Sequence, residues 1–99
     1  MNSITAIAFS GMNAATLRMS VAGYNVANAA TPAFRRQQVE QATQAGGGVT
    51  ASLSQADATG SDLAADAVEQ MSSVYVFKAN LRSVQVGHEM LGTLLDIRA

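Results

Sequence analysis

A single histidine, His88, stands beside Glu89 and is the natural candidate for a general base. Acid–base catalysis needs a partner group within hydrogen-bond reach, and a metal site needs several ligands at suitable spacing. No second histidine, no cysteine and no clustered carboxylates at ligand spacing accompany His88, which falls on an apolar helical stripe. A packed neutral ring is the ordinary role there. We therefore expect no catalytic residue, no metal ligand, no cofactor and no small-molecule substrate.

Three acids, Asp62, Asp66 and Glu69, share one helical face at spacings of four and three residues. Acids in the first turns of a helix complement its dipole, so we interpret them as solvated charges. Arg35 and Arg36 form an adjacent pair of positive charges. They could steady an acidic partner, but two adjacent arginines are ordinarily solvated.

Two other features lack the neighbouring residues that a binding site or an ion pair would need. Gly46–Gly48 is not followed by the lysine and helix of a phosphate-binding loop. Lys78 and Arg82, four residues apart, are like charges on one helix face and repel mildly when alone. Lys78 and Arg82 would be stabilising only if they paired with acids on a neighbouring chain.

The composition favours assembly over catalysis. Apolar residues make up 48% of the 99 residues, yet 19 residues are alanine, and charged residues are only 13%, about half the usual quarter. The net charge is −1 without any basic block, so we expect no nucleic-acid partner. No run of 18 apolar residues and no basic start with an apolar segment is present, so we expect neither a membrane span nor a cleaved signal.

Residues 1–30 are predicted to form a helix, capped by Asn2 or Ser3, in which Arg18 is the only charge. Gly11 and Gly23 lie inside it and either permit close approach of a neighbouring helix or are merely tolerated. An apolar stripe with heptad-like spacing runs along one side, and we take it as an assembly surface: Ile4, Ala8, Met12, Ala15, Met19, Ala22 and Val26.

Pro32 disfavours helical geometry at the residue before it, so this helix should end by about Ala29. Residues 31–60 then form a turn followed by one of two structures. One is a two-stranded ribbon with arms near 34–41 and 49–54, because apolar and polar residues alternate from Val49 to Leu53. The other is a Gly/Ser/Thr/Gln-rich linker.

Residues 61–97 are predicted to form the second helix, capped by Ser61 or Asp62. Its stripe includes Leu63, Ala67 and His88, and the members that we take as an assembly surface are Met71, Val74, Leu81, Val84, Leu91 and Leu95. This helix would be roughly 54 Å long against roughly 39 Å for the first. Its overhang therefore needs a partner beyond the first helix.

Both ends of the chain also resemble a known family. The stretches Ser10–Ala15 and Val21–Arg36 are similar to the N-terminal signature of bacterial flagellar basal-body rod and hook proteins. Asp62–Ala64, Val74–Asn80 and Glu89–Ile97 resemble the C-terminal signature, and the last run is especially close to proximal-rod and distal-rod members. The two ends cover about 70 of the 99 residues. The turn motif of the family would here comprise Asn25, Asn28, Thr31, Pro32 and Phe34.

The resemblance implies a structural axial subunit in the periplasmic rod, exported through the flagellar type III apparatus without a cleaved signal. It implies paired terminal helices and partners that are other copies and other axial proteins. The chain departs from the family at Tyr24, where Asn is usual, and at Ala33, where Gly is usual. Because Ala resists the left-handed conformation that Gly permits, the turn geometry stays open. The segment between Pro32 and Asp62 is also shorter than the insert that the family commonly has there.

Together these observations predict one domain over residues 1–99. The expected fold is mainly α, with two long antiparallel helices in a coiled-coil-like hairpin, joined by a short β-ribbon or loop. The expected function is a self-assembling rod subunit. One alternative is a helical binding module that engages an export chaperone or a regulator without polymerising, and the other is an enzyme that rests only on His88 and the acids.

Overall fold

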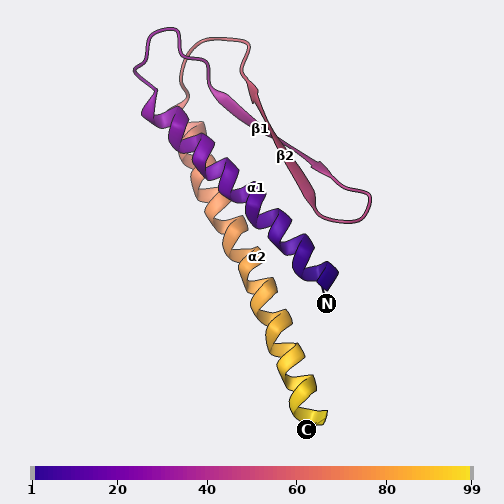
Figure 1. Cartoon of the computed structure of the whole chain (residues 1–99). Coiled ribbons are helices and arrows are strands. Elements are labelled where there is room, and N and C mark those ends of the chain that lie inside the picture. Colours follow the sequence, from indigo (N-terminus) through magenta and orange to yellow (C-terminus); the bar gives the residue numbers. More distant parts are fainter. Residues whose placement is uncertain (1, 99) are drawn as a thin grey trace.

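Two helices and a two-stranded sheet make up the described part of the chain (Figure 1). The structure is a computed structural model that describes the backbone of residues 2–98 and the side chains of residues 4–96. Helix α1 (Asn2–Ala27) is followed by strands β1 (Gln37–Thr43) and β2 (Val49–Gln55), and helix α2 (Leu63–Arg98) completes the order. The cap expected from Asn2 or Ser3 concerns side chains outside the described residues.

Helix α1 ends five residues before Pro32 because its last turn is capped by Asn28. The Asn28 backbone N–H donates to the Tyr24 carbonyl at 3.1 Å, and the Asn28 side-chain amide donates to the same carbonyl at 2.9 Å. Both bonds satisfy a carbonyl that the end of the helix leaves free. The chain then turns through Ala33, whose φ of 58° is left-handed despite its side chain.

The two strands pair antiparallel, with Val39 opposite Leu53 and Thr43 opposite Val49. The loop between them uses Gly47 and Gly48, both at positive φ, where glycine has no steric cost. A side chain is also excluded at Gly48 by space, since a Cβ there would lie 2.7 Å from Ser10 Oγ of α1. The same oxygen accepts the Val49 N–H at 3.1 Å, which fixes the loop end of the sheet to α1.

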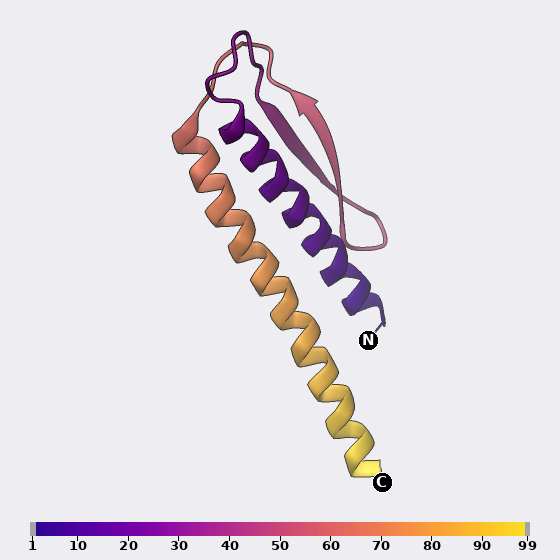
Figure 2. The ribbon, with the colours of Figure 1, turned by 60° about the vertical axis from the view of Figure 1, so that its left-hand side comes forward.

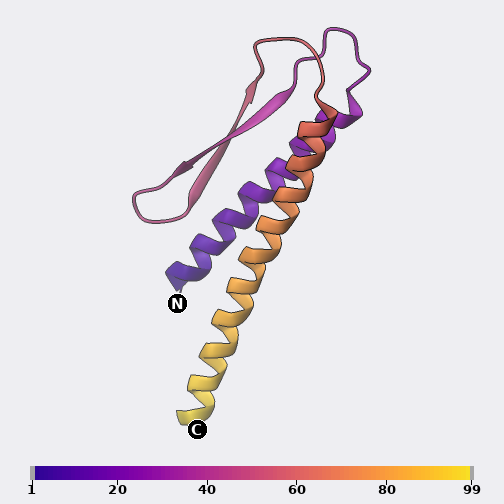
Figure 3. The same cartoon turned by 180° about the vertical axis from the view of Figure 1, so that it is seen from behind.

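Helix α1 lies between α2 and the sheet (Figures 2 and 3). One face of α1, containing Ile7, Ser10, Ala14 and Val21, lies beneath the sheet, where Ala14 and Val21 are buried. A second face lies against α2 and consists almost entirely of small residues, which are Ala8, Gly11, Ala15 and Ala22.

Helix α2 contributes polar residues to this contact with α1, which we call the seam. Asp66 and Ser73 are 1% and 0% exposed, and Asn80 approaches Gly11 so closely that a Cβ there would lie 2.7 Å from the Asn80 amide nitrogen. Gly23 is different, because the nearest atom to a Cβ there lies at 3.7 Å. Of the two open interpretations, close approach therefore holds at Gly11, and Gly23 is merely tolerated.

The start of α2 agrees with the predicted cap at Asp62. The Asp62 carboxylate accepts the Ala65 N–H at 3.0 Å, and the helix begins at the next residue, Leu63. Its 36 residues exceed the 26 of α1, so α2 projects past the N-terminus of α1 (Figure 1). The molecule is correspondingly elongated, with extents of 64 × 25 × 13 Å.

The predicted fold, a helical hairpin joined by a short β-ribbon or loop, is wrong. Residues 28–62 separate the helices, and they build a two-stranded sheet that packs along α1 as a third layer. The sheet is stable in this position because the inward face of α1 offers it Ser10 and small side chains, whereas an isolated ribbon has no such support. The chain is mainly α-helical, but the sheet is part of its packing.

Neither helix within residues 2–98 combines the length and the hydrophobicity needed to cross a lipid bilayer.

Candidate functional site

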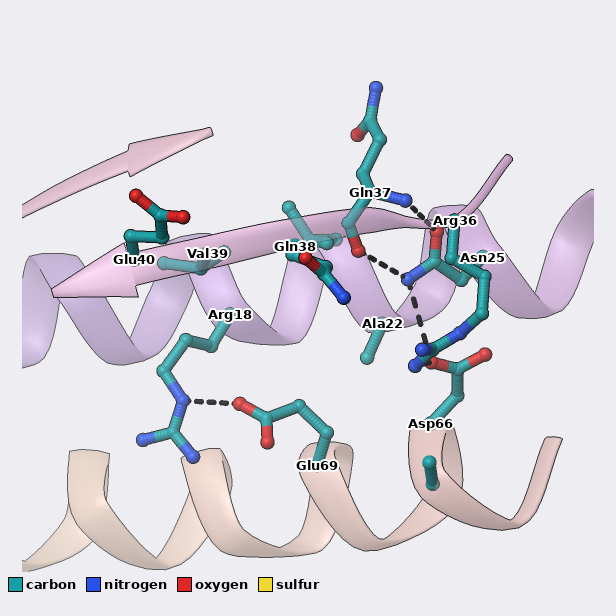
Figure 4. Close-up of a pocket in the computed structure, with 12 residues that line it drawn as sticks. Arg18, Ala22, Asn25, Arg36, Gln37, Gln38, Val39, Glu40, Asp66 and Glu69 are labelled. Atoms are coloured by element: carbon teal, nitrogen blue, oxygen red, sulfur yellow. Dashed lines mark hydrogen bonds and ion pairs between the residues drawn. The ribbon is translucent and has the colours of Figure 1, made fainter. Parts of the chain in front are cut away.

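A polar junction forms where the end of α1, the start of β1 and the start of α2 meet (Figure 4). Asn25 is 2% exposed and joins α1 to β1. Its side-chain amide donates to the Gln37 carbonyl at 2.9 Å, and its side-chain oxygen accepts the Gln37 N–H at 2.9 Å. The side chain thus replaces a neighbouring strand at the start of β1, which positions the sheet on the helix.

The same junction contains an ion pair between Arg36, directly before β1, and Asp66 of α2. Arg36 Nη2 contacts Asp66 Oδ1 at 2.5 Å, with the two side chains 22% and 1% exposed. The Asn25 amide donates to the same oxygen at 3.4 Å. The hydrogen bond to Asp66 raises the pKa of Arg36 further above its usual value, against the opposing effect of burial. The stability that this charge contributes is therefore present throughout the physiological pH range.

A second ion pair lies one helical turn further along, between Arg18 of α1 and Glu69 of α2. The Arg18 guanidinium also donates to the Ser72 hydroxyl at 3.2 Å. A hollow of about 340 Å³ lies between the two ion pairs, under Gln38 and Val39 of β1. Both arginines that line the hollow, Arg18 and Arg36, are already neutralised by an acid, so they offer no free cation to a ligand. The two ion pairs instead hold α1, the start of β1 and α2 together.

These contacts correct two interpretations of the sequence. Asp66 and Glu69 were expected to be solvated helix charges, and Arg36 a solvated arginine, but all three are in ion pairs. Asp62 caps α2 instead of forming part of a cluster. Within residues 2–98, no group of three or more His, Cys, Asp or Glu side chains could hold a metal ion.

The residues of the predicted turn motif are brought together in part. Asn25 lies in the junction, and Asn28 caps α1 and accepts the Thr31 hydroxyl at 3.2 Å. The ring of Phe34 packs on Tyr24, with centroids 5.7 Å apart at 54°. Pro32 is exposed. Tyr24 thus gains an aromatic partner that an asparagine at this position could not use.

His88 is exposed, so its predicted role as a packed ring on the apolar stripe is wrong. The contact of α2 with α1 instead follows Asp66, Ser73 and Asn80, so position 88 lies outside it. Lys78 and Arg82 are exposed on α2.

The predicted stripe of α1 divides between the inside and the outside of the molecule. Ala8, Ala15 and Ala22 are 4%, 0% and 1% exposed and form the seam with α2. Met12 and Met19 are half-buried at the edge of the seam. Ile4 and Val26, at the two ends, are 56% and 41% exposed. Alanines therefore make the internal contact, and the larger side chains remain accessible.

The predicted stripe of α2 faces solvent over most of its length. Val84 is half-buried, while the exposed members are Met71, Val74, Leu81, Leu91 and Leu95. Met71 and Val74 line an open hollow of about 450 Å³ together with Met19 of α1. Met71, Leu91 and Leu95, which are 73%, 46% and 60% exposed, are thus available to another molecule, whereas Val74 and Leu81, both 38% exposed, are largely covered within this one.

Sequence reasoning missed the buried ion pair and several of the exposed apolar residues, namely Val68, Tyr75, Val86, Met90 and Leu94. One signal could have indicated the ion pair. A basic cluster at Arg35 and Arg36 and an acidic cluster at Asp62 to Glu69 bracket the central segment, and a sheet that returns the chain to its starting point brings such flanking charges together.

No protein-family model and no curated protein matches this chain.

Proposed function

We propose that this chain is a structural axial subunit of the bacterial flagellar basal-body rod. The observation that carries the proposal is that small apolar side chains are buried, whereas large ones are exposed. The buried apolar residues are Ala8, Ala14, Ala15, Val21 and Ala22, whereas large apolar side chains are exposed along both helices. A monomer in water rarely leaves so many large apolar groups uncovered, and contiguous ones ordinarily mark an interaction surface.

The arrangement of the layers supports the same proposal. The sheet and α2 cover different sides of α1, so the side of α2 that faces away from α1 remains open from end to end (Figure 2). It carries Val68 and Met71, which are 65% and 73% exposed. An elongated subunit with one long accessible helix suits side-by-side packing into a tube.

The resemblance of both ends to rod proteins supports an assembly in the flagellar rod. The chain would reside in the periplasmic rod, reach it through the flagellar type III apparatus, and contact other copies and other axial proteins. The charge-poor α1, whose only charge Arg18 is already paired with Glu69, offers little repulsion to such neighbours.

A deletion strain tests the biological part of the proposal. Loss of the chain should abolish or impair swimming, and the tagged chain should co-purify with basal bodies. Normal motility together with absence of the chain from purified basal bodies would contradict the rod assignment. A chain that instead co-purifies with one cytoplasmic partner would favour the non-polymerising binding module.

A point variant tests the surface. Met71→Asp places a charge on a side chain that is 73% exposed and lies outside the alanine contacts of the seam, in the open hollow that it shares with Met19, so the chain should fold but lose incorporation into basal bodies. Thr50→Asp, at an exposed position of β2 opposite Ala42, is the matched control and should be incorporated normally. Equal incorporation of both variants would argue against this face as the contact.

A further inference from the structure

A second set of exposed residues on α2 has the spacing of a helix–helix contact. Its members, which we call the outer stripe, follow one another at spacings of four and three residues: Tyr75, Ala79, Arg82, Val86, Glu89 and Thr93. This is the 3.5-residue period that keeps one seam facing a partner helix. All six are exposed, and at 100° per residue they lie on the side of α2 opposite Ser73 and Asn80.

The charges along this side are arranged in a fixed order. Lys78 and Arg82 come first, and Glu89 and Asp96 follow. All four are exposed, and none of them belongs to an ion pair within the part of the chain whose side chains the structure describes. Two cations followed by two acids form a self-complementary pattern when the same helix is laid against itself in the opposite direction.

We propose that two copies of the chain pair through their outer stripes as an antiparallel, two-fold symmetric dimer centred on Val86. When Val86 faces its counterpart, Arg82 faces position 90 of the other copy, one residue from Glu89. Lys78 faces position 94, two residues from Asp96. At about 1.5 Å per residue these offsets are within reach of long side chains. A parallel pair would instead place Arg82 against Arg82.

The apolar surface around the centre fits the same contact. Val86 and Met90 border two open hollows of about 360 and 380 Å³, and Ile4 of α1 lines the first of them. Met90 and Leu94 are both 57% exposed. In the antiparallel register, Met90 of one copy lies opposite Arg82 of the other, whose methylene stem borders the first hollow. The pair would thus cover α2 from Tyr75 through the end that projects past α1.

A two-fold contact uses the same patch on both copies and closes on itself. It therefore cannot extend into a filament, and growth must use surfaces that the pair leaves uncovered, such as the N-terminal part of the same side of α2, with Val68 and Met71. The dimer goes beyond the proposed function and does not depend on it, since it requires no rod and no other axial protein.

Disulfide trapping tests the register directly, because the chain has no cysteine. Val86→Cys should cross-link to itself under mild oxidation. Thr93→Cys should not, since the two positions 93 would lie about 21 Å apart along the paired helices. A mixture of Ala79→Cys and Thr93→Cys chains should cross-link to each other. Ala58→Cys, on an exposed loop position, reports random collision.

Two results would overturn the proposal: Val86→Cys that cross-links no faster than Ala58→Cys, or Thr93→Cys that cross-links to itself as fast as Val86→Cys. The second result would indicate a parallel pair.

Charge reversal provides an independent test by sedimentation equilibrium. Arg82→Glu should weaken the dimer about tenfold or more by placing like charges together, and adding Glu89→Arg in the same chain should restore it. Circular dichroism checks that the helices persist. An Arg82→Glu chain that pairs like the unchanged protein would refute the proposal. Neither experiment reads motility, so failure of the dimer and failure of the rod assignment are distinguishable.

Discussion

A buried carboxylate is costly in any small protein, and here it is placed where three elements converge. Asp66 is 1% exposed, and its charge is balanced by Arg36 and by the amide of Asn25. Removing the partner of a buried charge is more harmful than removing the whole pair, because the remaining charge stays desolvated. The junction therefore decides whether the sheet stays on α1.

Arg36→Ala should lower the free energy of unfolding by about 3 kcal/mol, since Asp66 would be buried without its cation. Denaturant titration followed by circular dichroism measures the loss. Arg35→Ala is the matched control, because the exposed Arg35 only donates to the Ala56 carbonyl at 2.6 Å, and it should cost less than about 1 kcal/mol. Equal losses in the two variants would mean that the buried pair has no special role.

Ala33 carries backbone strain that its neighbours impose. Its φ of 58° is left-handed, which glycine tolerates and alanine resists. Ala33→Gly should raise the free energy of unfolding by about 0.5–1 kcal/mol, with a melting temperature a few degrees higher. Ala67→Gly, in the interior of α2, should have the opposite sign. A loss of stability at Ala33→Gly would contradict the strain.

At the scale of the elements, the seam between α1 and α2 depends on small residues that let two helices approach closely. Gly11 and Gly23 make this testable, because both lie inside α1 but only Gly11 touches α2 closely. Gly23→Ala should stabilise the protein by about 0.5–1 kcal/mol through helix propensity alone. Gly11→Ala should destabilise it by about 1 kcal/mol, because the new Cβ meets Asn80.

Thermal unfolding measures both changes. The cause of the Gly11→Ala loss is checked by combining it with Asn80→Ala, which removes the opposing side chain and should recover part of the stability. If Gly11→Ala stabilised the chain as much as Gly23→Ala, the close approach of the helices at this point would be refuted.

The projecting end of α2 should be the least protected part of the helix. Residues 91–96 are exposed and have no neighbouring element, and such short unsupported helix ends fray. Hydrogen exchange of a dilute sample should show fast exchange there and slower exchange from Asp66 to Asn80. Protection of residues 91–96 should increase with protein concentration. Uniform protection in a dilute monomer would contradict this prediction.

The existence of both helices could be predicted from the sequence, because apolar periodicity, Asp62 and Pro32 act locally. Their bounds, 1–30 and 61–97, came within a few residues of Asn2–Ala27 and Leu63–Arg98. The ribbon arms near 34–41 and 49–54 were also close to Gln37–Thr43 and Val49–Gln55. The packing of the sheet on α1 was not predictable, since it depends on contacts such as Ser10 with Val49, 39 residues apart.

The candidate site was only partly predictable for a related reason. A search for stripes selects large apolar residues, and on α2 these point outward, while the seam uses Asp66, Ser73 and Asn80. Small and polar residues carry little hydrophobic signal, so the inner face of α2 could not be told from its outer face. Arg36 and Asp66 lie 30 residues apart, and only the return of the chain through the sheet brings them together.

At the scale of the whole molecule, three layers leave one long helix uncovered on its far side. The internal core is mostly alanine, and alanine contributes little burial free energy per residue. The large apolar side chains of α2 therefore gain most of their burial only when copies associate. This makes folding and assembly interdependent, as in other chains whose stability depends on protomer concentration.

Sedimentation velocity of the purified chain over rising concentration tests this central claim most directly. We expect monomers that first pair and then form larger species as concentration increases, with Met71→Asp blocking the larger species. A chain that stays monomeric at every concentration, or a pair that never grows, would contradict it.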